Sequence, residues 1–248
     1  MSTTERWGRS PKFHLRADGI AALTRGWQPG ELLEVGAGTG EMTLEFLQRG
    51  FRAALYDLGE QTRAELRRRF AGNDAVRVTD AIETLPDASV DYLIAFEVLE
   101  HIEDDAAALR AWTAKLRPGG RLLVSVPAHQ RKFSATDHRV GHVRRYEREQ
   151  LRSLIAGAGY DAVDIACYGF PLGNIGRVAG NLLERPASPT EPDAVARSIE
   201  SGTQQSGVVV AVSRGLRPWM LWPFFVMQRL TFGLDIGDGY IATARRRD

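Results

Sequence analysis

Short apolar runs alternate with longer segments of helical periodicity along the first two thirds of this chain. Five mostly apolar runs predict strands at 31–36, 51–57, 75–80, 91–97 and 120–127. The segments between them predict amphipathic helices at 41–49, 60–70 and 104–120, the last one stopping at Pro-Gly-Gly. Strands that are apolar on both faces and separated by helices indicate an α/β fold with a mostly parallel sheet covered on two sides.

The pattern continues with a helix over 147–160, a strand near 161–168 and a closing strand over 239–246. Two stretches depart from it. Residues 128–146 form a polar loop rich in Arg and His, where a connection of about two to six residues is usual. Residues 169–238 hold a Gly-rich helix candidate (173–184), a Pro-, Ser- and Glu-rich stretch expected to be mobile (185–207) and an aromatic segment (217–233).

Composition narrows the class of protein. The 248 residues are 44% hydrophobic and 25% charged, which suits one compact domain over 1–248. The net charge of +1 argues against a nucleic-acid binder. Cys167 is the only cysteine and excludes an internal disulfide, and the N-terminus lacks a secretory signal, which predicts a cytoplasmic protein. The longest uncharged apolar stretch, 218–227, is half of the roughly 20 residues that a transmembrane helix needs.

A glycine-rich turn, EVGAGTG at 34–40, follows the first predicted strand. Its glycines fit GxGxG, whereas Glu41 stands where the dinucleotide fingerprint GxGxxG needs its third glycine. A ligand without a phosphate suits this tighter turn, because glycine lacks a Cβ and lets the ligand lie across the backbone. The alternative is a tight turn that binds nothing.

Two acids end the next two predicted strands. The carboxylate of Asp57 is placed to accept hydrogen bonds from both hydroxyls of a ribose, and Asp80 lies in reach of an adenine amino group. Because Asp is favoured at helix starts, both residues have a purely structural alternative as N-caps.

Together with TDAIETLP (79–86) and LRPGGRLLVSVP (116–127), these residues resemble the class I S-adenosylmethionine-dependent methyltransferases over about 30–168 and the closing strand. The resemblance implies a doubly wound, mostly parallel, Rossmann-like sheet of seven strands whose last two strands form an antiparallel hairpin at the edge. It implies S-adenosylmethionine as cofactor. The site residues that it implies are Gly36, Gly38 and Gly40 shaping the cofactor loop, Glu34 orienting it, Asp57 on the ribose, and Asp80 with Ala81 facing adenine.

The resemblance also divides the chain into functional parts. We expect a helical lid at 1–29, a cofactor-binding core at 30–168, a helical and aromatic insertion or lid at 169–238 and the closing strand at 239–248.

The sequence EVLEH at 97–101 ends the fourth predicted strand, beside the cofactor loop. Glu97, Glu100 and His101 fall at i, i+3 and i+4, one face of a helical turn, with Val98 and Leu99 pointing inward. Two carboxylates and an imidazole suit a divalent cation such as Mg²⁺, Mn²⁺, Zn²⁺ or Fe²⁺. ExxEH is similar to the metal-binding turn of small-RNA 2′-O-methyltransferases and ubiquinone-pathway O-methyltransferases, which implies His142 as a further ligand.

Two alternatives to the metal stay open. In one, the site is metal-free, and His101 or His142 is the general base. In the other, EVLEH is a surface turn whose acids cap the following helix.

The expected reaction is methylation of a hydroxyl oxygen on a small molecule, such as a sugar, a lipid-linked compound or a secondary metabolite. The signature of amino-group methylators is missing after the fourth strand, where the chain reads FEVL. Rival hypotheses are an RNA 2′-O-methyltransferase, a nicotinamide-dependent oxidoreductase and a catalytically silent binding protein.

Two segments bear on the acceptor. Residues 131–152 carry seven Arg or Lys against three acids, which either clamp a phosphate or carboxylate on the acceptor or pair with the adjacent acids. The aromatic segment either shapes an apolar pocket, rests on a membrane surface, or packs in a core or dimer interface. The sequence does not fix the oligomeric state.

Overall fold

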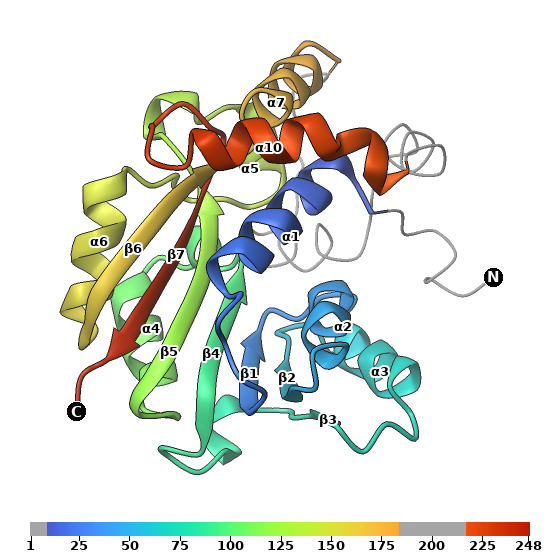
Figure 1. Cartoon of the computed structure of the whole chain (residues 1–248). Coiled ribbons are helices and arrows are strands. Elements are labelled where there is room, and N and C mark those ends of the chain that lie inside the picture. The colour runs from blue at the N-terminus through green and yellow to red at the C-terminus, as the bar shows by residue number, and fades with distance from the viewer. Residues whose placement is uncertain (1–8, 184–216) are drawn as a thin grey trace. The chain divides into compact units, whose positions relative to one another are not determined.

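The computed structural model describes residues 9–183 and 217–248. Within them, seven strands form one sheet in the order β3-β2-β1-β4-β5-β7-β6 (Figure 1). The strands are β1 (Glu31–Val35), β2 (Arg52–Tyr56), β3 (Val76–Val78), β4 (Val90–Phe96), β5 (Leu116–Pro127), β6 (Tyr160–Tyr168) and β7 (Gly239–Arg246). The α-helices are α1 (Pro11–Leu23), α2 (Glu41–Leu47), α3 (Glu60–Arg69), α4 (Asp105–Thr113), α5 (Ala135–Arg139), α6 (Arg148–Gly157), α7 (Leu172–Leu183) and α10 (Trp222–Leu230).

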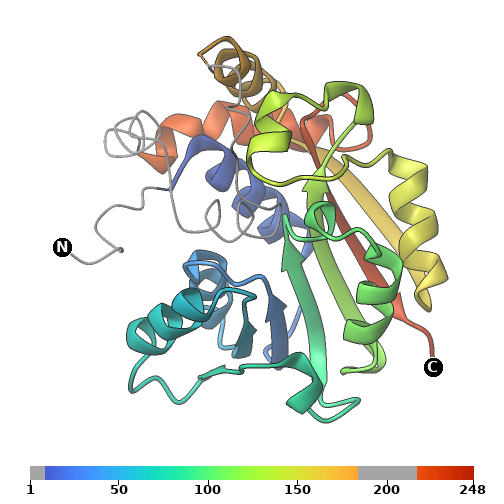
Figure 2. The same cartoon turned by 180° about the vertical axis from the view of Figure 1, so that it is seen from behind.

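The first five strands pair in parallel. From β1 the chain steps outward to β2 and β3, whereas from β4 it steps the other way to β5. Since parallel crossovers are right-handed, α2 and α3 cover one face of the sheet and α4 covers the opposite face. Figure 1 accordingly shows α4 behind β4 and β5, and Figure 2 shows it in front of them. The strand β7 runs opposite to β5, so the predicted sheet of seven strands with an antiparallel strand near its edge is confirmed (Figure 1).

The chain divides into two compact units. We call one the strand unit, which comprises Gly26–Val126, Glu149–Asp164 and Ala242–Asp248. We call the other the helical unit, which comprises Met1–Arg25, Pro127–Arg148 and Ile165–Ile241. The strand unit contains β1 to β5 with α2, α3 and α4, and the helical unit contains α1, α5, α7 and α10.

The core of the strand unit explains its continuous apolar runs. Leu33, Leu55, Leu93 and Leu123, on four neighbouring strands, are all fully buried. Residues 93–96 of β4 are buried without alternation, as expected for a strand with helices over both faces.

One predicted helix boundary is wrong. The helix expected over 104–120 ends at Thr113, and β5 begins at Leu116, so the Pro-Gly-Gly sequence lies inside the first part of that strand. The guanidinium of Arg246 in β7 donates hydrogen bonds to the carbonyls of Thr113 and Leu116, which satisfies backbone groups where the helix ends. Sequence periodicity carries no information about this long-range partner.

The helical unit contains the segments that interrupt the sequence pattern. The N-terminal helix expected within 1–29 is α1, which has Pro11 in its first turn and Ser10 as N-cap. The Gly-rich helix candidate is α7, and the polar loop holds the short helix η4 (Gln130–Lys132) and α5. The predicted mobile stretch 185–207 lies outside the described residues. Among those that the structure describes, no helix has both the length and the apolar character needed to cross a bilayer.

Candidate active site

The glycine turn between β1 and α2 has the backbone that its sequence predicts. Gly36, Gly38 and Gly40 have φ angles of +72°, +52° and +76°, in the left-handed region that favours glycine. At position 36 glycine is also required for steric reasons, because a Cβ there would lie 2.4 Å from Cγ2 of Val98. The turn therefore presents bare backbone where β1 ends.

Side chains from β1, α2 and α3 form hydrogen bonds that stabilise this turn. Glu34 is buried in β1, and its Oε2 accepts a 2.6 Å hydrogen bond from the hydroxyl of Thr43 on α2. Arg69 of α3 donates to the carbonyl of Thr39 and binds Oε1 of Glu41 at 2.5 Å. The first residue of α2 is thus a carboxylate, which disfavours the binding of a pyrophosphate at this helix N-terminus.

Asp57 directly follows β2 and touches the glycine turn. Its Oδ2 accepts a 2.9 Å hydrogen bond from the backbone N–H of Gly38, and its Oδ1 accepts one of 3.0 Å from Gly59. A carboxylate can accept about four hydrogen bonds, so these two leave capacity for hydroxyls of a ligand.

Asp80 follows β3 and is strongly exposed, with 71% of its side-chain surface accessible. Its carboxylate forms ion pairs with Arg67 at 2.7 Å and with Arg63 at 3.2 Å. The hydrogen bond from Arg67 is the largest cause that lowers the pKa of Asp80. The next residue, Ala81, is extended, and its carbonyl accepts hydrogen bonds from the hydroxyls of Thr79 and Thr84. The predicted contacts of Asp80 and Ala81 with adenine stay predictions.

The EVLEH segment forms the short 3-10 helix η3 (Leu99–His101) after β4. Leu99 is buried, as expected, and Val98 lies against Gly36. The expectation that Glu97 shares a helical face with Glu100 and His101 is wrong, because Glu97 has a φ of +56°.

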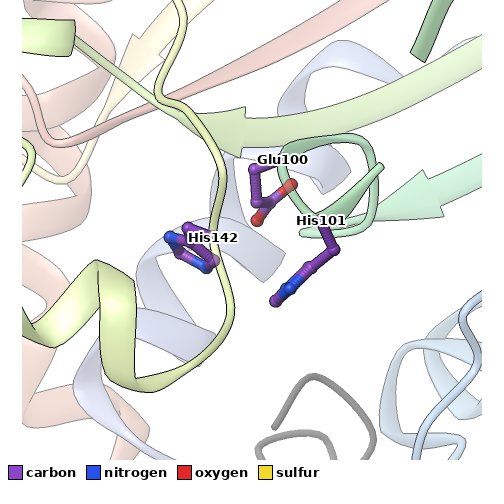
Figure 3. A group of neighbouring side chains, drawn as sticks. All are labelled: Glu100, His101 and His142. Atoms are coloured by element: carbon purple, nitrogen blue, oxygen red, sulfur yellow. The ribbon is translucent and has the colours of Figure 1, made fainter. Parts of the chain in front are cut away.

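Contacts from β5 hold Glu97 in this conformation. The backbone N–H of Glu97 donates to the carbonyl of Ser125 at 2.8 Å, and the Ser125 hydroxyl donates to Glu97 Oε1 at 3.1 Å. A left-handed backbone costs a residue with a Cβ roughly 1–2 kcal/mol, and such residues cluster at functional sites. Glu100 is fully buried and His101 is half-buried, and Figure 3 shows both side chains projecting from η3.

His142 belongs to the helical unit, in the segment after α5 (Figure 3). Its Nδ1 lies 2.8 Å from Oδ1 of Asp137, and its backbone N–H donates to the Asp137 carbonyl at 2.9 Å. An ionised carboxylate only accepts hydrogen bonds, so Nδ1 carries a proton, and in the neutral imidazole Nε2 then carries the lone pair.

Asp137 itself is almost completely buried. Arg145 Nε donates to Oδ1 at 2.9 Å, and the backbone N–H and hydroxyl of Ser134 donate to Oδ2 at 2.9 and 3.1 Å. Burial alone would raise the pKa of Asp137, but hydrogen bonds from His142 and Arg145, with their charges, lower it to about 2. The sequence reasoning did not single out Asp137, although Ser-x-x-Asp at 134–137 is the pattern of a capping box.

The metal ligands implied by the sequence come from both units. Glu97, Glu100 and His101 lie in the strand unit and His142 in the helical unit. A metal site made of all four stays a prediction.

Comparison with known proteins identifies the family. A family model described as a methyltransferase domain matches residues 12–165. This chain belongs to the methyltransferase domain family. A protein of Mycobacterium tuberculosis that is named as an S-adenosylmethionine-dependent methyltransferase is 33% identical over 143 residues, which are 56% of this chain and 51% of that protein.

Two further comparisons agree with this membership. A ubiquinone biosynthesis O-methyltransferase of Idiomarina loihiensis is 35% identical over 134 residues, 50% of this chain and 55% of that enzyme. The chain thus spans about half the length of these two curated relatives. A solved 1,6-didemethyltoxoflavin-N1-methyltransferase from Burkholderia thailandensis has the same fold, with a TM-score of 0.54, 20% identity, and coverage of 95% of this chain and 78% of that one.

Three basic residues of the loop at 131–152 form internal ion pairs. Arg145 binds Asp137 and also lies 3.5 Å from Asp238. Arg148 pairs with Asp235 at 2.7 Å, and Arg152 pairs with Glu149 at 3.5 Å. The alternative of pairing with adjacent acids is confirmed for Arg145 and Arg152, whereas Arg148 pairs with an acid outside this loop.

The aromatic segment at 217–233 has both buried and exposed side chains. Leu221 is buried, whereas Trp219 and Trp222 are exposed. Core packing is therefore excluded for these two tryptophans, and their packing in a dimer interface stays a prediction.

Proposed function

We propose that this chain is a methyltransferase that uses S-adenosylmethionine to methylate a hydroxyl oxygen on a small molecule. The observation that carries the proposal is the glycine turn, with its bare left-handed backbone tied to Asp57. Glu41 favours a donor without a pyrophosphate, because its carboxylate opens α2.

The residues at the ends of β1 to β4 fit an adenosyl group. Gly36, Gly38 and Gly40 form the surface on which the donor lies, and Glu34 fixes the turn through Thr43. Asp57 keeps acceptor capacity for ribose hydroxyls, and Asp80 with Ala81 lies on the adenine side. Methyl transfer from a sulfonium is an in-line displacement, so these residues contribute mainly by positioning.

A histidine acts as the general base that removes the proton from the acceptor hydroxyl. The Nε2 lone pair of His142 is oriented by Asp137, which makes His142 a suitable general base. His101, on the turn that packs against the glycine loop, is the other candidate.

The donor set of Glu97, Glu100, His101 and His142 also suits Mg²⁺, Mn²⁺, Zn²⁺ or Fe²⁺, since it combines carboxylate oxygens with imidazole nitrogens. A bound cation would lower the pKa of an acceptor hydroxyl. Metal analysis of the untreated protein, and activity before and after chelation, distinguish this version from the metal-free one.

The acceptor that we propose is apolar or lipid-linked, with an alternative that bears a phosphate or carboxylate. One relative is named for ubiquinone biosynthesis, and three arginines of the basic loop are already paired internally, which weakens the anionic alternative.

Isothermal titration calorimetry with S-adenosylhomocysteine tests the donor. We expect a one-to-one complex and a raised melting temperature, and no binding of NAD. Absence of heat with S-adenosylhomocysteine, together with an unchanged melting temperature, would overturn the proposal, whereas binding of NAD instead would support an oxidoreductase.

Two further assays address the remaining rivals. With a net charge of +1, no RNA gel shift is expected at physiological salt. A silent binding protein would keep its donor affinity but show no turnover with any acceptor extract. In an active enzyme, alanine at His101 or His142 abolishes turnover while donor affinity is kept.

A further inference from the structure

One face of the helical unit exposes an unusual number of large apolar side chains. They lie on the 3-10 helix η5 (Pro218–Leu221) and on α10, which follows it directly (Figure 1). We call them the apolar face, which consists of Trp219, Met220, Trp222, Val226, Met227 and Leu230, all exposed. We propose that the apolar face binds peripherally to the surface of an anionic phospholipid bilayer.

The other side of α10 is fixed to the helical unit by buried polar contacts. Gln228 is fully buried, and its side-chain amide donates to the carbonyl of Leu15 at 3.0 Å and to Asp18 Oδ2 at 2.8 Å. Its Oε1 accepts a hydrogen bond of 3.2 Å from the backbone N–H of Gly169. These bonds to α1 and to the end of β6 set the rotation of α10 about its axis.

With this rotation fixed, the apolar face points outward. Trp222, Val226 and Leu230 are spaced four residues apart and share one side of α10. The exposed fractions of Trp219, Trp222 and Leu230 are 75%, 65% and 81%, values far above those of a packing surface. Contiguous exposed apolar side chains of this kind mark an interaction site.

The charges of the helices near the apolar face favour a partner that is anionic. Four helices of this unit, α1, α7, η5 and α10, with their flanking residues at 9–25, 172–183 and 217–234, carry seven Arg or Lys and one acid, Asp18. Two of these cations form ion pairs, Arg229 with Asp18 and Arg177 with Asp238. The whole chain has 32 basic and 31 acidic residues, so these segments are more positive than the chain as a whole. Arg217 directly precedes the helices that carry the apolar face, and it is exposed. Basic residues around an apolar helix face are the pattern of helices that lie in a membrane interface with anionic lipids.

The tryptophans fit the same partner. Trp219 lies in η5 and Trp222 is the first residue of α10. Tryptophan is enriched at the headgroup level of bilayers because its ring is amphipathic. A methyltransferase docked in this way would meet an apolar acceptor in the bilayer, although the docking itself depends on neither donor nor acceptor.

Vesicle flotation of the full-length chain tests the proposal, with phosphatidylcholine vesicles compared with vesicles that also contain phosphatidylglycerol. We expect binding to the mixed vesicles, little binding to phosphatidylcholine alone, and a loss of binding as salt is raised. Replacing both Trp222 and Leu230 with serine should lower the partition coefficient roughly tenfold or more, because two exposed apolar side chains leave the interface. The conservative pair Trp222→Phe and Leu230→Met should keep most of the binding.

Charge is tested by a matched pair of exposed arginines. Arg217→Ser, beside the apolar face, should weaken binding to the mixed vesicles, whereas Arg77→Ser on β3 of the strand unit should not. Melting temperatures should stay unchanged in all these variants, since the replaced side chains are exposed.

Three results would overturn the proposal. The first is no flotation of the wild-type chain with either vesicle. The second is flotation that is insensitive to lipid charge and to the serine pair. The third is a dimer in light scattering that the serine pair dissociates, which would assign the apolar face to a second copy of the chain. Calorimetry with S-adenosylhomocysteine in the absence of vesicles reports separately on the proposed function.

Discussion

The backbone N–H of Gly38 and the carboxylate of Asp57 are joined by a hydrogen bond of 2.9 Å. The acid that is proposed to hold the ribose therefore also shapes the loop on which the donor lies. The two strands β1 and β2 are coupled at their ends by this contact, and by the bonds from Gly36 and Ala37 to the carbonyl of Tyr56.

Removing the Asp57 carboxylate should weaken both the loop and the donor site. Asp57→Ala loses two charge-assisted hydrogen bonds to backbone N–H groups, so we expect at least a roughly tenfold loss of S-adenosylhomocysteine affinity and a lower melting temperature. Calorimetry and thermal unfolding measure the two effects. Asp161→Ala, an exposed acid of the same unit, is the control. Unchanged affinity in Asp57→Ala would remove Asp57 from the site.

Adding a methyl group at Gly36 should be costly for two separable reasons. Gly36→Ala places Cβ 2.4 Å from Val98 Cγ2 and forces alanine to a φ of +72°. The double variant Gly36→Ala/Val98→Ala removes the clash but keeps the backbone strain, worth roughly 1–2 kcal/mol. Chemical denaturation should therefore show the single variant as the less stable of the two. Gly157→Ala, where a Cβ meets nothing within 4 Å, should have little effect.

We expect Glu97 to lower the stability of the fold while being needed for activity. It holds a φ of +56°, which glycine adopts without strain, so Glu97→Gly is expected to keep or raise the free energy of unfolding. Activity should nevertheless fall, because the carboxylate that accepts from Ser125 is lost beside the acceptor turn. Glu97→Ala, which keeps the strain, is the comparison. An active Glu97→Gly enzyme would show that the strained conformation is only structural.

Local patterns were sufficient to predict most of the fold. The apolar runs predicted all seven strands, and the glycine spacing predicted a tight turn after the first of them. Both features depend on neighbours in sequence. The end of α4 was missed because Arg246, more than 100 residues away, provides its capping partner.

The site was predicted less completely for the same reason. Glu97 looked helical because its spacing to Glu100 and His101 fits a helix, but Ser125 on the adjacent strand fixes it in a left-handed conformation. Asp137 looked like one more acid in a basic loop. Its hydrogen bonds to His142 and Arg145 exist only after the loop has folded back on α5.

The hydrogen bond from His142 to Asp137 should fix the tautomer of this histidine. Asp137→Asn keeps the size of the side chain but removes its charge, so the Nδ1–H tautomer of His142 loses its preference. Nitrogen NMR of labelled histidine should show mostly Nδ1–H in the wild type and a mixture of tautomers in the variant. Turnover should fall mainly through kcat, because the residues proposed to bind the donor are in the glycine turn and at Asp57.

Stability should change with pH in a defined direction. The pKa of Asp137 is lowered from 3.8 to about 2 in the folded state, so its contribution is complete above pH 3.8 and is lost as pH falls towards 2. A shift of this size corresponds to about 2 kcal/mol, and the difference in unfolding free energy between wild type and Asp137→Asn should therefore shrink with acid. Asp235→Asn, which breaks another ion pair of the helical unit, is the matched control and should leave the His142 tautomer unchanged. If both variants reduce kcat equally without a tautomer shift, Asp137 stabilises the loop and has no positioning role.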